Sequence, residues 1–306
     1  MEFSQDMYPY QPTWSNTRIN LLQRCPRAFV LRYGLAKLSE NHPQGQLLSE
    51  AFAIQTPWIL MHQIVRQVVL DYVEDYANGT VWSHELIRIR FTKDYAQAIL
   101  HRNQRIEQFQ QYGLEQTLFQ KTQPEDHLIE MGVDSCLNLV QNQNLVSLLK
   151  SGSIERLQPT NSIVKQNIRV YCSPDLIHHS PDGTSVIKLH LYGKISSFEN
   201  VFQASLLQEY GDRNSIVIQF SLSRRKWFVH KFKPNSMQRK QALNIISEDV
   251  KQMENAFWSV RKNNDLTKVP LADTYRSCTS CNVRFICPSR HGYEQAKAEQ
   301  RSLMCQ

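Results

Sequence analysis

Four cysteines near the two ends of this 306-residue chain have the spacing of a metal or cluster site. Three lie close together as Cys278-x2-Cys281-x5-Cys287, and the fourth, Cys25, lies near the N-terminus. Thiolates presented from one short loop can share a single metal or cluster. A site with four sulfur ligands needs one more than this loop supplies. We expect Cys25 to be that ligand, so that the cofactor joins the two ends of the chain.

Three other interpretations of these cysteines stay open. A zinc site could combine the three C-terminal cysteines with His291, since Cys3His is a common structural zinc set. Disulfides are disfavoured by the odd count of seven cysteines and by an acidic, aromatic N-terminus unlike a signal peptide. The cysteines could also be unrelated small buried hydrophobes. Proline follows both Cys25 and Cys287, which favours an iron–sulfur cluster because Cys-Pro recurs at such ligands.

A second group of residues with functional chemistry is basic. Lys and Arg outnumber Asp and Glu by 35 to 28, giving a net charge of +7, which suits a polyanionic partner. Basic residues gather around Trp227 and Phe228, at Arg224, Arg225, Lys226, Lys231 and Lys233. This strip could hold a nucleic-acid backbone, or it could be the solvated face of a hairpin. No apolar run approaches the roughly 20 residues of a membrane span, and we expect a cytoplasmic protein without a membrane partner.

The elements that position these residues change character at Gly152. Before it we expect helices: one capped by Ser15 that carries Cys25, one that begins at Thr56-Pro57 and carries His62, and stretches at 84–119 and 125–150, with a loop at 39–55. After it, short β-branched or alternating segments predict strands. These lie at 163–177, 186–192, 215–222 and 226–232, with helices at 198–210 and 237–260. The expected fold is α/β, a mixed central sheet flanked by helices.

Several motifs follow one another in an order that resembles a known superfamily. Cys25-Pro26-Arg27-Ala28-Phe29 is similar to an opening cluster ligand on a serine-capped helix, and His62 is placed like a metal-binding helical histidine. Cys172-Ser173-Pro174-Asp175 stands where Gly-x-x-Asp is usual, ahead of the hairpin turn Pro181-Asp182-Gly183. A helix with Gln203 and Tyr210 and the three C-terminal cysteines complete the series. The chain thereby resembles the PD-(D/E)XK nucleases, in the RecB-like branch with a four-cysteine iron–sulfur cluster. That branch includes CRISPR-associated adaptation exonucleases and the nuclease ends of helicase–nucleases.

The resemblance implies a restriction-endonuclease-like single domain over residues 1–306. It implies an inserted helical region at 80–150 and a C-terminal clasp at 270–291 joined to Cys25. The implied cofactors are a 4Fe-4S cluster and, in an active enzyme, Mg2+ or Mn2+ held by His62 and Asp175. The implied partners are DNA, single-stranded or with free ends, contacted by Gln203 and the basic strip, and a helicase or repair protein.

The chain departs from the superfamily at the residues that cut. The strand after the turn usually carries Asp/Glu-x-Lys, and here Lys188 takes the place of the acid and His190 that of the lysine. A lysine ammonium about 4 Å from a divalent ion, at an effective dielectric near 20, repels it by about 8 kcal/mol. We therefore expect a DNA-binding pseudonuclease in repair, recombination or defence. The alternatives are an active metal-dependent DNA exonuclease or endonuclease with a rearranged site, and a protein-interaction subunit of a larger complex.

Overall fold

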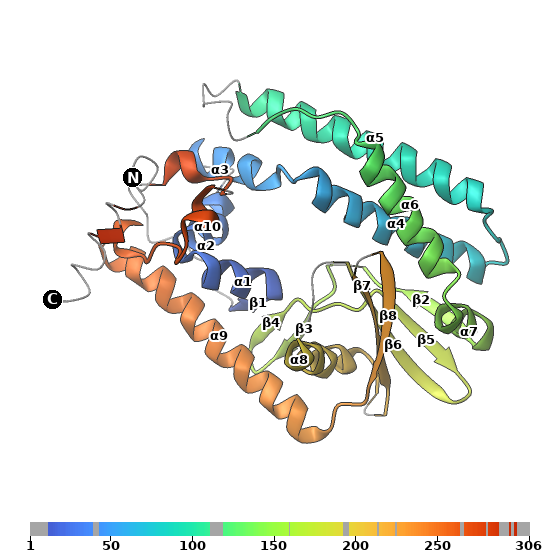
Figure 1. The fold of residues 1–306 in the computed structure, drawn as a ribbon. Coiled ribbons are helices and arrows are strands. Elements are labelled where there is room, and N and C mark those ends of the chain that lie inside the picture. The colour runs from blue at the N-terminus through green and yellow to red at the C-terminus, as the bar shows by residue number, and fades with distance from the viewer. Residues whose placement is uncertain are drawn as a thin grey trace.

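The computed structural model is a mixed α/β structure, mostly helical, with a five-stranded mixed sheet and a small three-stranded sheet (Figure 1). It describes residues 12–38, 43–110, 119–158, 160–191, 196–212, 214–223, 225–263, 266–279, 281–287, 294, 297 and 298. The α/β class expected from the sequence is confirmed at this level.

The N-terminal helix predicted from Ser15 is two helices that meet at Cys25. Ser15 caps α1 (Asn16–Arg24), as expected, by accepting a hydrogen bond from the Arg18 backbone N–H at 3.3 Å. Cys25 then has extended backbone angles (φ −162°, ψ 100°), and α2 (Pro26–Tyr33) begins with a proline. Proline lacks an N–H and disfavours helical geometry in the preceding residue. The break therefore places Cys25 in a helix–helix junction instead of within a helix.

The loop predicted at 39–55 is wrong where the structure describes it. A short 3-10 turn, Leu35–Leu38, leads to α3 (Pro43–Ala53), while residues 39–42 lie outside the described part of the chain. Leu48 and Ala51 of α3 are fully buried. Their burial outweighs the turn signal of Pro43 and Gly45, and proline is well tolerated at the first position of a helix.

Four helices form a layer over one face of the large sheet (Figure 1). The first of them begins at Pro57, as predicted, and Thr56 caps it by accepting a hydrogen bond from the Ile59 N–H at 3.3 Å. The helices are α4 (Pro57–Ala77), α5 (His84–Gln110), α6 (Asp126–Val140) and α7 (Gln143–Ser151). Their buried side chains form one hydrophobic cluster with Ile187, Leu189 and Phe220 of the sheet. Two predicted helical stretches thus become three helices, because the chain turns at Gln141–Asn142 between α6 and α7.

The large sheet has the strand order β2-β5-β6-β7-β8, and of its described strand pairs β6 and β7 are parallel while the other three are antiparallel. The strands are β2 (Ser153–Arg156), β5 (Leu176–Ser180), β6 (Gly183–His190), β7 (Ile216–Ser223) and β8 (Lys226–Phe232). Gly183, at φ +124°, closes the predicted hairpin turn. Between β6 and β7 the chain forms α8 (Ser197–Leu207), which packs on the sheet face opposite α4 and α6 through Ala204 and Leu207 (Figure 1).

The single strand predicted at 163–177 is three strands. β3 (Ile163–Lys165) and β4 (Ile168–Val170) form a hairpin whose turn residues Gln166 and Asn167 have positive φ, and β5 begins only at Leu176. β4 also pairs in parallel with β1 (Thr13–Trp14), which the sequence did not predict, giving the small sheet β1-β4-β3.

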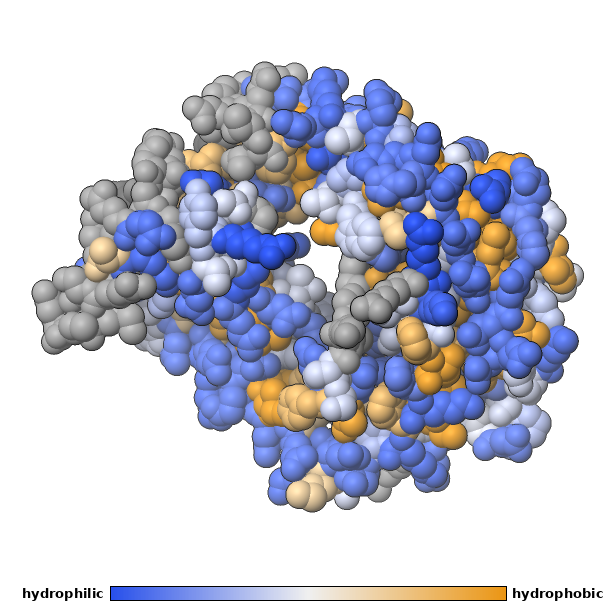
Figure 2. Space-filling view, viewed as in Figure 1, coloured by the Kyte–Doolittle hydropathy of each residue, from blue (hydrophilic) through white to orange (hydrophobic). Residues whose placement is uncertain are grey.

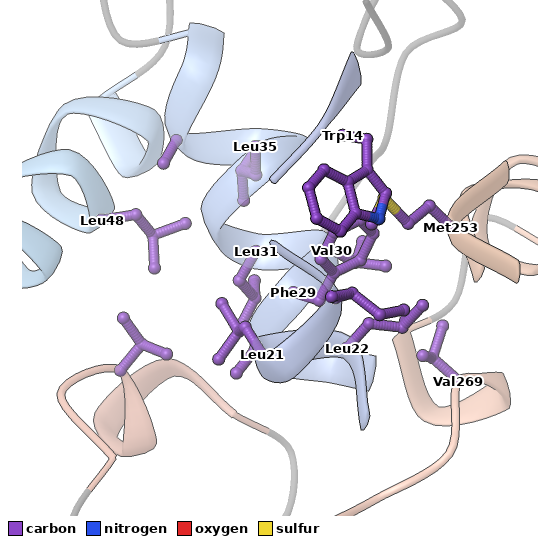
Figure 3. Close-up of a cluster of buried hydrophobic side chains, with 14 of the residues drawn as sticks. Trp14, Leu21, Leu22, Phe29, Val30, Leu31, Leu35, Leu48, Met253 and Val269 are labelled. Carbon is purple, nitrogen blue, oxygen red and sulfur yellow. The ribbon is translucent and has the colours of Figure 1, made fainter. Parts of the chain in front are cut away.

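The two ends of the chain share a second hydrophobic core. The long helix α9 (Ser236–Asn263) and the segments after it return to α1 and α2. Trp14 donates to Asp249 of α9 at 2.8 Å, and Arg27 donates to the Val269 and Thr267 carbonyls at 2.7 and 2.8 Å. Figure 3 shows Trp14 and the side chains of α1 and α2 gathered with Met253 and Val269. Among the described residues, the helices are too short or too polar for any of them to span a bilayer.

Candidate functional sites

The four cysteines singled out by their spacing line one hollow in this shared core. Cys25 comes from the junction of α1 and α2, and Cys278 from α10 (Tyr275–Thr279). Cys281 and Cys287 flank a 3-10 turn, Arg284–Ile286. Backbone hydrogen bonds from Cys281 to Cys278, from Arg284 to Cys281 and from Cys287 to Arg284, at 3.1 to 3.2 Å, make this loop a run of tight turns. The fold therefore brings Cys25 to the C-terminal loop.

The surroundings of the hollow are basic and apolar. Arg27 and Arg284 line it with Leu31, Leu271 and Val283. Burial raises the pKa of the Cys25 thiol, and it raises that of Cys281 to about 12, with smaller contributions from the neighbouring thiols. In the described part of the chain, no group of three or more His, Cys, Asp or Glu side chains is arranged to hold a single metal ion. His291, the alternative zinc ligand, lies outside the described residues.

A second site is built around Asp175, which is 0% exposed directly before β5. Its backbone extends the sheet: its N–H donates to the Ile187 carbonyl at 2.9 Å, and its carbonyl accepts from the Leu157 N–H at 3.0 Å. Its carboxylate accepts from the Leu189 N–H through Oδ2 at 2.7 Å. The backbone of Asp175 is thus held from both sides and its carboxylate is held from β6, so these contacts fix its position without any charged partner.

Two cations share the other oxygen of this carboxylate. Lys188 Nζ lies 3.6 Å from Asp175 Oδ1 and donates to the Ser173 carbonyl at 2.6 Å. Arg66 forms a direct hydrogen bond and ion pair with the same Oδ1 through Nη2. Lys188 and Arg66 therefore place two positive charges beside the one carboxylate of Asp175.

Arg66 is the functional candidate that sequence reasoning missed. It lies on α4 four positions after His62, so both residues occupy one side of the helix. The four-residue spacing from His62 was the one sequence signal that could have indicated Arg66 as a site residue. The partner, Asp175, is 109 positions away in the sequence, and no local pattern connects the two.

The two candidate histidines are placed differently. His190 follows Lys188 by two positions on β6, so both face the side of the sheet that α8 covers. The pKa of His190 is lowered to about 4, first by burial and then by Lys188, with smaller influences from Asp175, His230 and Arg66. His62 packs edge-on against Trp58 at 4.7 Å between ring centres, and burial lowers its pKa to about 4. Both rings are neutral at physiological pH.

The expected basic strip is divided by the alternation of β8, an edge strand of the sheet. Trp227 faces α6, where its Nε1 donates to the Ser135 carbonyl at 2.8 Å, so Lys226 and Phe228 face the other way. Lys231 has the same parity as Trp227 and projects from the opposite face to Lys226. The cationic side chains of Arg225, Lys226, Lys231 and Lys233 are all exposed. Arg224 lies outside the described residues, and Gln203 is half-buried on α8.

Comparison with known proteins adds little. No family model matches the chain, and no curated protein matches it. Among solved structures the chain is similar to the crystal structure of SSO0001, with a TM-score of 0.28 and 12% sequence identity over 74% of this chain and 97% of that one. A similarity this low assigns neither a fold family nor a function.

Proposed function

We propose that this chain is a DNA-binding protein of the RecB-like iron–sulfur nuclease class, with a nuclease-like centre that holds no catalytic metal. The carrying observation is the pairing of Asp175 with both Arg66 and Lys188. The restriction-endonuclease-like fold is part of the proposal. It is supported by the antiparallel hairpin β5-β6 and by the helical connection through α8 to the parallel strand β7.

Charge explains why this centre would reject magnesium. Mg2+ requires oxygen ligands, with carboxylates supplying most of the charge. Here the one buried carboxylate already accepts hydrogen bonds on both oxygens. At about 4 Å and an effective dielectric near 20, each neighbouring cation would repel a divalent ion by about 8 kcal/mol. Two cations therefore oppose metal binding and one carboxylate favours it, which is why we propose that cleavage is lost.

The C-terminal clasp is proposed to hold a 4Fe-4S cluster through Cys25, Cys278, Cys281 and Cys287. The donor set fits, because four thiols from both ends of the chain line one hollow with two arginines that would offset thiolate charge. Proline follows both Cys25 and Cys287, which favours a cluster over zinc because Cys-Pro recurs at iron–sulfur ligands. Bound there, the cluster would supply covalent cross-links between the chain ends.

DNA binding is supported by charge and by shape. The net charge is +7, and the exposed Lys226 lies on the same face of β8 as Phe228, which is 49% exposed and can stack on a base. Figure 2 shows an opening near the middle of this face of the molecule, with hydrophilic side chains along part of its rim. We propose single-stranded or end-containing DNA as the ligand, with a helicase or repair protein as partner, in repair, recombination or defence.

The binding test uses anaerobically purified, iron-loaded protein and fluorescence anisotropy with labelled single-stranded and blunt duplex oligonucleotides. On single strands we expect the logarithm of the affinity to fall linearly with that of salt, by about 0.7 per phosphate contacted. Lys226→Ala should weaken binding and lower that slope. Lys251→Ala, which removes another exposed lysine, paired with Glu248 on α9, should change neither. A folded, iron-loaded protein that binds neither DNA at low salt would refute the proposal and favour the protein-interaction subunit.

A further inference from the structure

The centre around Asp175 has hydrogen-bond donors that its own contacts leave unused. Arg66 donates a hydrogen bond to Asp175 through Nη2, and its Nε is buried without a hydrogen-bond partner. Lys188 has three donors, directed in part at the Ser173 carbonyl and at Asp175. On the same side of β6 as Lys188, the Nε2 atom of His190 is also buried without a partner, and it donates or accepts according to the tautomer of the neutral ring. An unpaired buried donor such as Arg66 Nε costs free energy, so this arginine has a place for a further acceptor.

The charges of the centre favour an anion as the missing acceptor. Arg66 and Lys188 carry two positive charges against the single negative charge of Asp175, while His190 is neutral. The carboxylate is 0% exposed, whereas the side chains of Arg66 and Lys188 are 27% and 21% exposed. A ligand that arrives from solvent therefore meets the two cations, and the buried carboxylate holds them in place from behind.

We propose that Arg66 and Lys188 form a phosphate-binding site that works without a metal ion, with Asp175 as the positioning residue that holds both cations. Phosphate fits because the arginine fork matches its oxygens and the lysine adds a point charge. An active enzyme of the resembled class would reach phosphate through a metal at this place; here the side chains do so directly. The identification of the phosphate as part of DNA rests on the proposed function, but the site itself does not.

The first test uses inorganic phosphate, which separates this proposal from DNA binding. In EDTA, phosphate should raise the thermal melting temperature of the iron-loaded wild type. It should not do so for Arg66→Gln. The matched control is Arg156→Gln, because Arg156 is an arginine of similar exposure, 24%, paired with Asp71 and Glu74. Arg156→Gln should respond to phosphate as the wild type does. Equal stabilisation of wild type and Arg66→Gln, or none of the wild type, would overturn the proposal.

The second test measures single-stranded DNA binding in EDTA. Arg66→Gln should lower the affinity by about tenfold, the value of a hydrogen bond to a charged group, and reduce the salt slope by about 0.7, while Arg66→Lys should recover part of both. Oligonucleotides with a terminal phosphate or a terminal hydroxyl identify the source. A preference for the phosphorylated end that Arg66→Gln abolishes assigns a terminal phosphate, and equal losses on both assign a phosphodiester. Wild-type affinity that collapses in EDTA would overturn the metal-free site.

Discussion

Replacing Asp175 with asparagine tests whether its carboxylate serves two cations or a metal. The change keeps the size of the side chain and removes its charge. In this structure Arg66 and Lys188 then lose their shared anion, and the Leu189 N–H loses a charged acceptor. In a metal-binding centre, acids crowd together and repel one another when the metal is absent, so losing one of them relieves that repulsion. The two accounts therefore predict opposite signs for the change in stability.

The magnitude follows from burial. Removing one partner of a fully buried ion pair costs about 3–5 kcal/mol. Asp175 is 0% exposed, but Arg66 and Lys188 are 27% and 21% exposed, so solvent screens part of that loss. The weakened hydrogen bond from Leu189 adds about 1 kcal/mol. We expect Asp175→Asn to lower the free energy of unfolding by about 2–4 kcal/mol.

The assay is urea unfolding in EDTA, followed by circular dichroism, of iron-loaded wild type and Asp175→Asn. Asp71→Asn is the control, because Asp71 also pairs with two arginines but near the surface, and Glu74 remains to pair with Arg156. Its loss should be at most about 1 kcal/mol. If Asp175→Asn is as stable as the wild type, or more stable, the ion-pair account of this centre is wrong.

Three further predictions test the clasp, the buried histidine and the helical layer. Cys25→Ser should lose most of the iron measured after anaerobic purification, whereas Cys136→Ser, a change in the helical layer, should keep it; one zinc and no iron in the wild type would contradict the clasp. His62 has a pKa of about 4 in the folded protein against 6.5 unfolded, so unfolding takes up a proton between those values and stability falls as pH falls from 6.5 to 4, by about 3 kcal/mol. Urea unfolding across that range should show a smaller loss in His62→Gln, and an equal loss would disprove the assignment. Gly132→Ala would place a Cβ 1.9 Å from the buried Phe91 ring and should cost about 1–3 kcal/mol; an unchanged melting temperature would contradict the packing of α5 on α6.

Local signals predicted the elements well where the deciding interaction was local. Ser15 caps the helix it was expected to cap, and the helix expected to begin at Thr56-Pro57 does begin there, because each capping hydrogen bond spans only three residues. The predictions were wrong where tertiary burial or an unusual backbone conformation determined the secondary structure. Burial of Leu48 and Ala51 made α3 from an expected loop. The positive φ of Gln166 and Asn167 divided one expected strand into a hairpin and a later strand.

Site residues that belong to a sequence motif could be predicted, and those that depend on tertiary contacts could not. The cysteine spacing indicated the C-terminal loop and made Cys25 the expected fourth ligand, but its approach to that loop depends on the long-range packing of the two chain ends in one core. The charge inversion at Lys188 was visible in the sequence. Arg66 was not, because its ion pair with Asp175 joins α4 to the start of β5, 109 positions further along the chain. Strand alternation, which divides the cations of β8 between two faces, was predictable in principle once the strand was assigned.

The most direct test of the central claim is cleavage of labelled single- and double-stranded DNA by the iron-loaded protein, with Mg2+ and Mn2+ each supplied and Asp175→Ala purified identically alongside. Our account predicts no cleavage above the level that Asp175→Ala also gives, with either metal. Cleavage by the wild type that disappears in Asp175→Ala would contradict it, because it would show that a metal-dependent active site survives around this carboxylate.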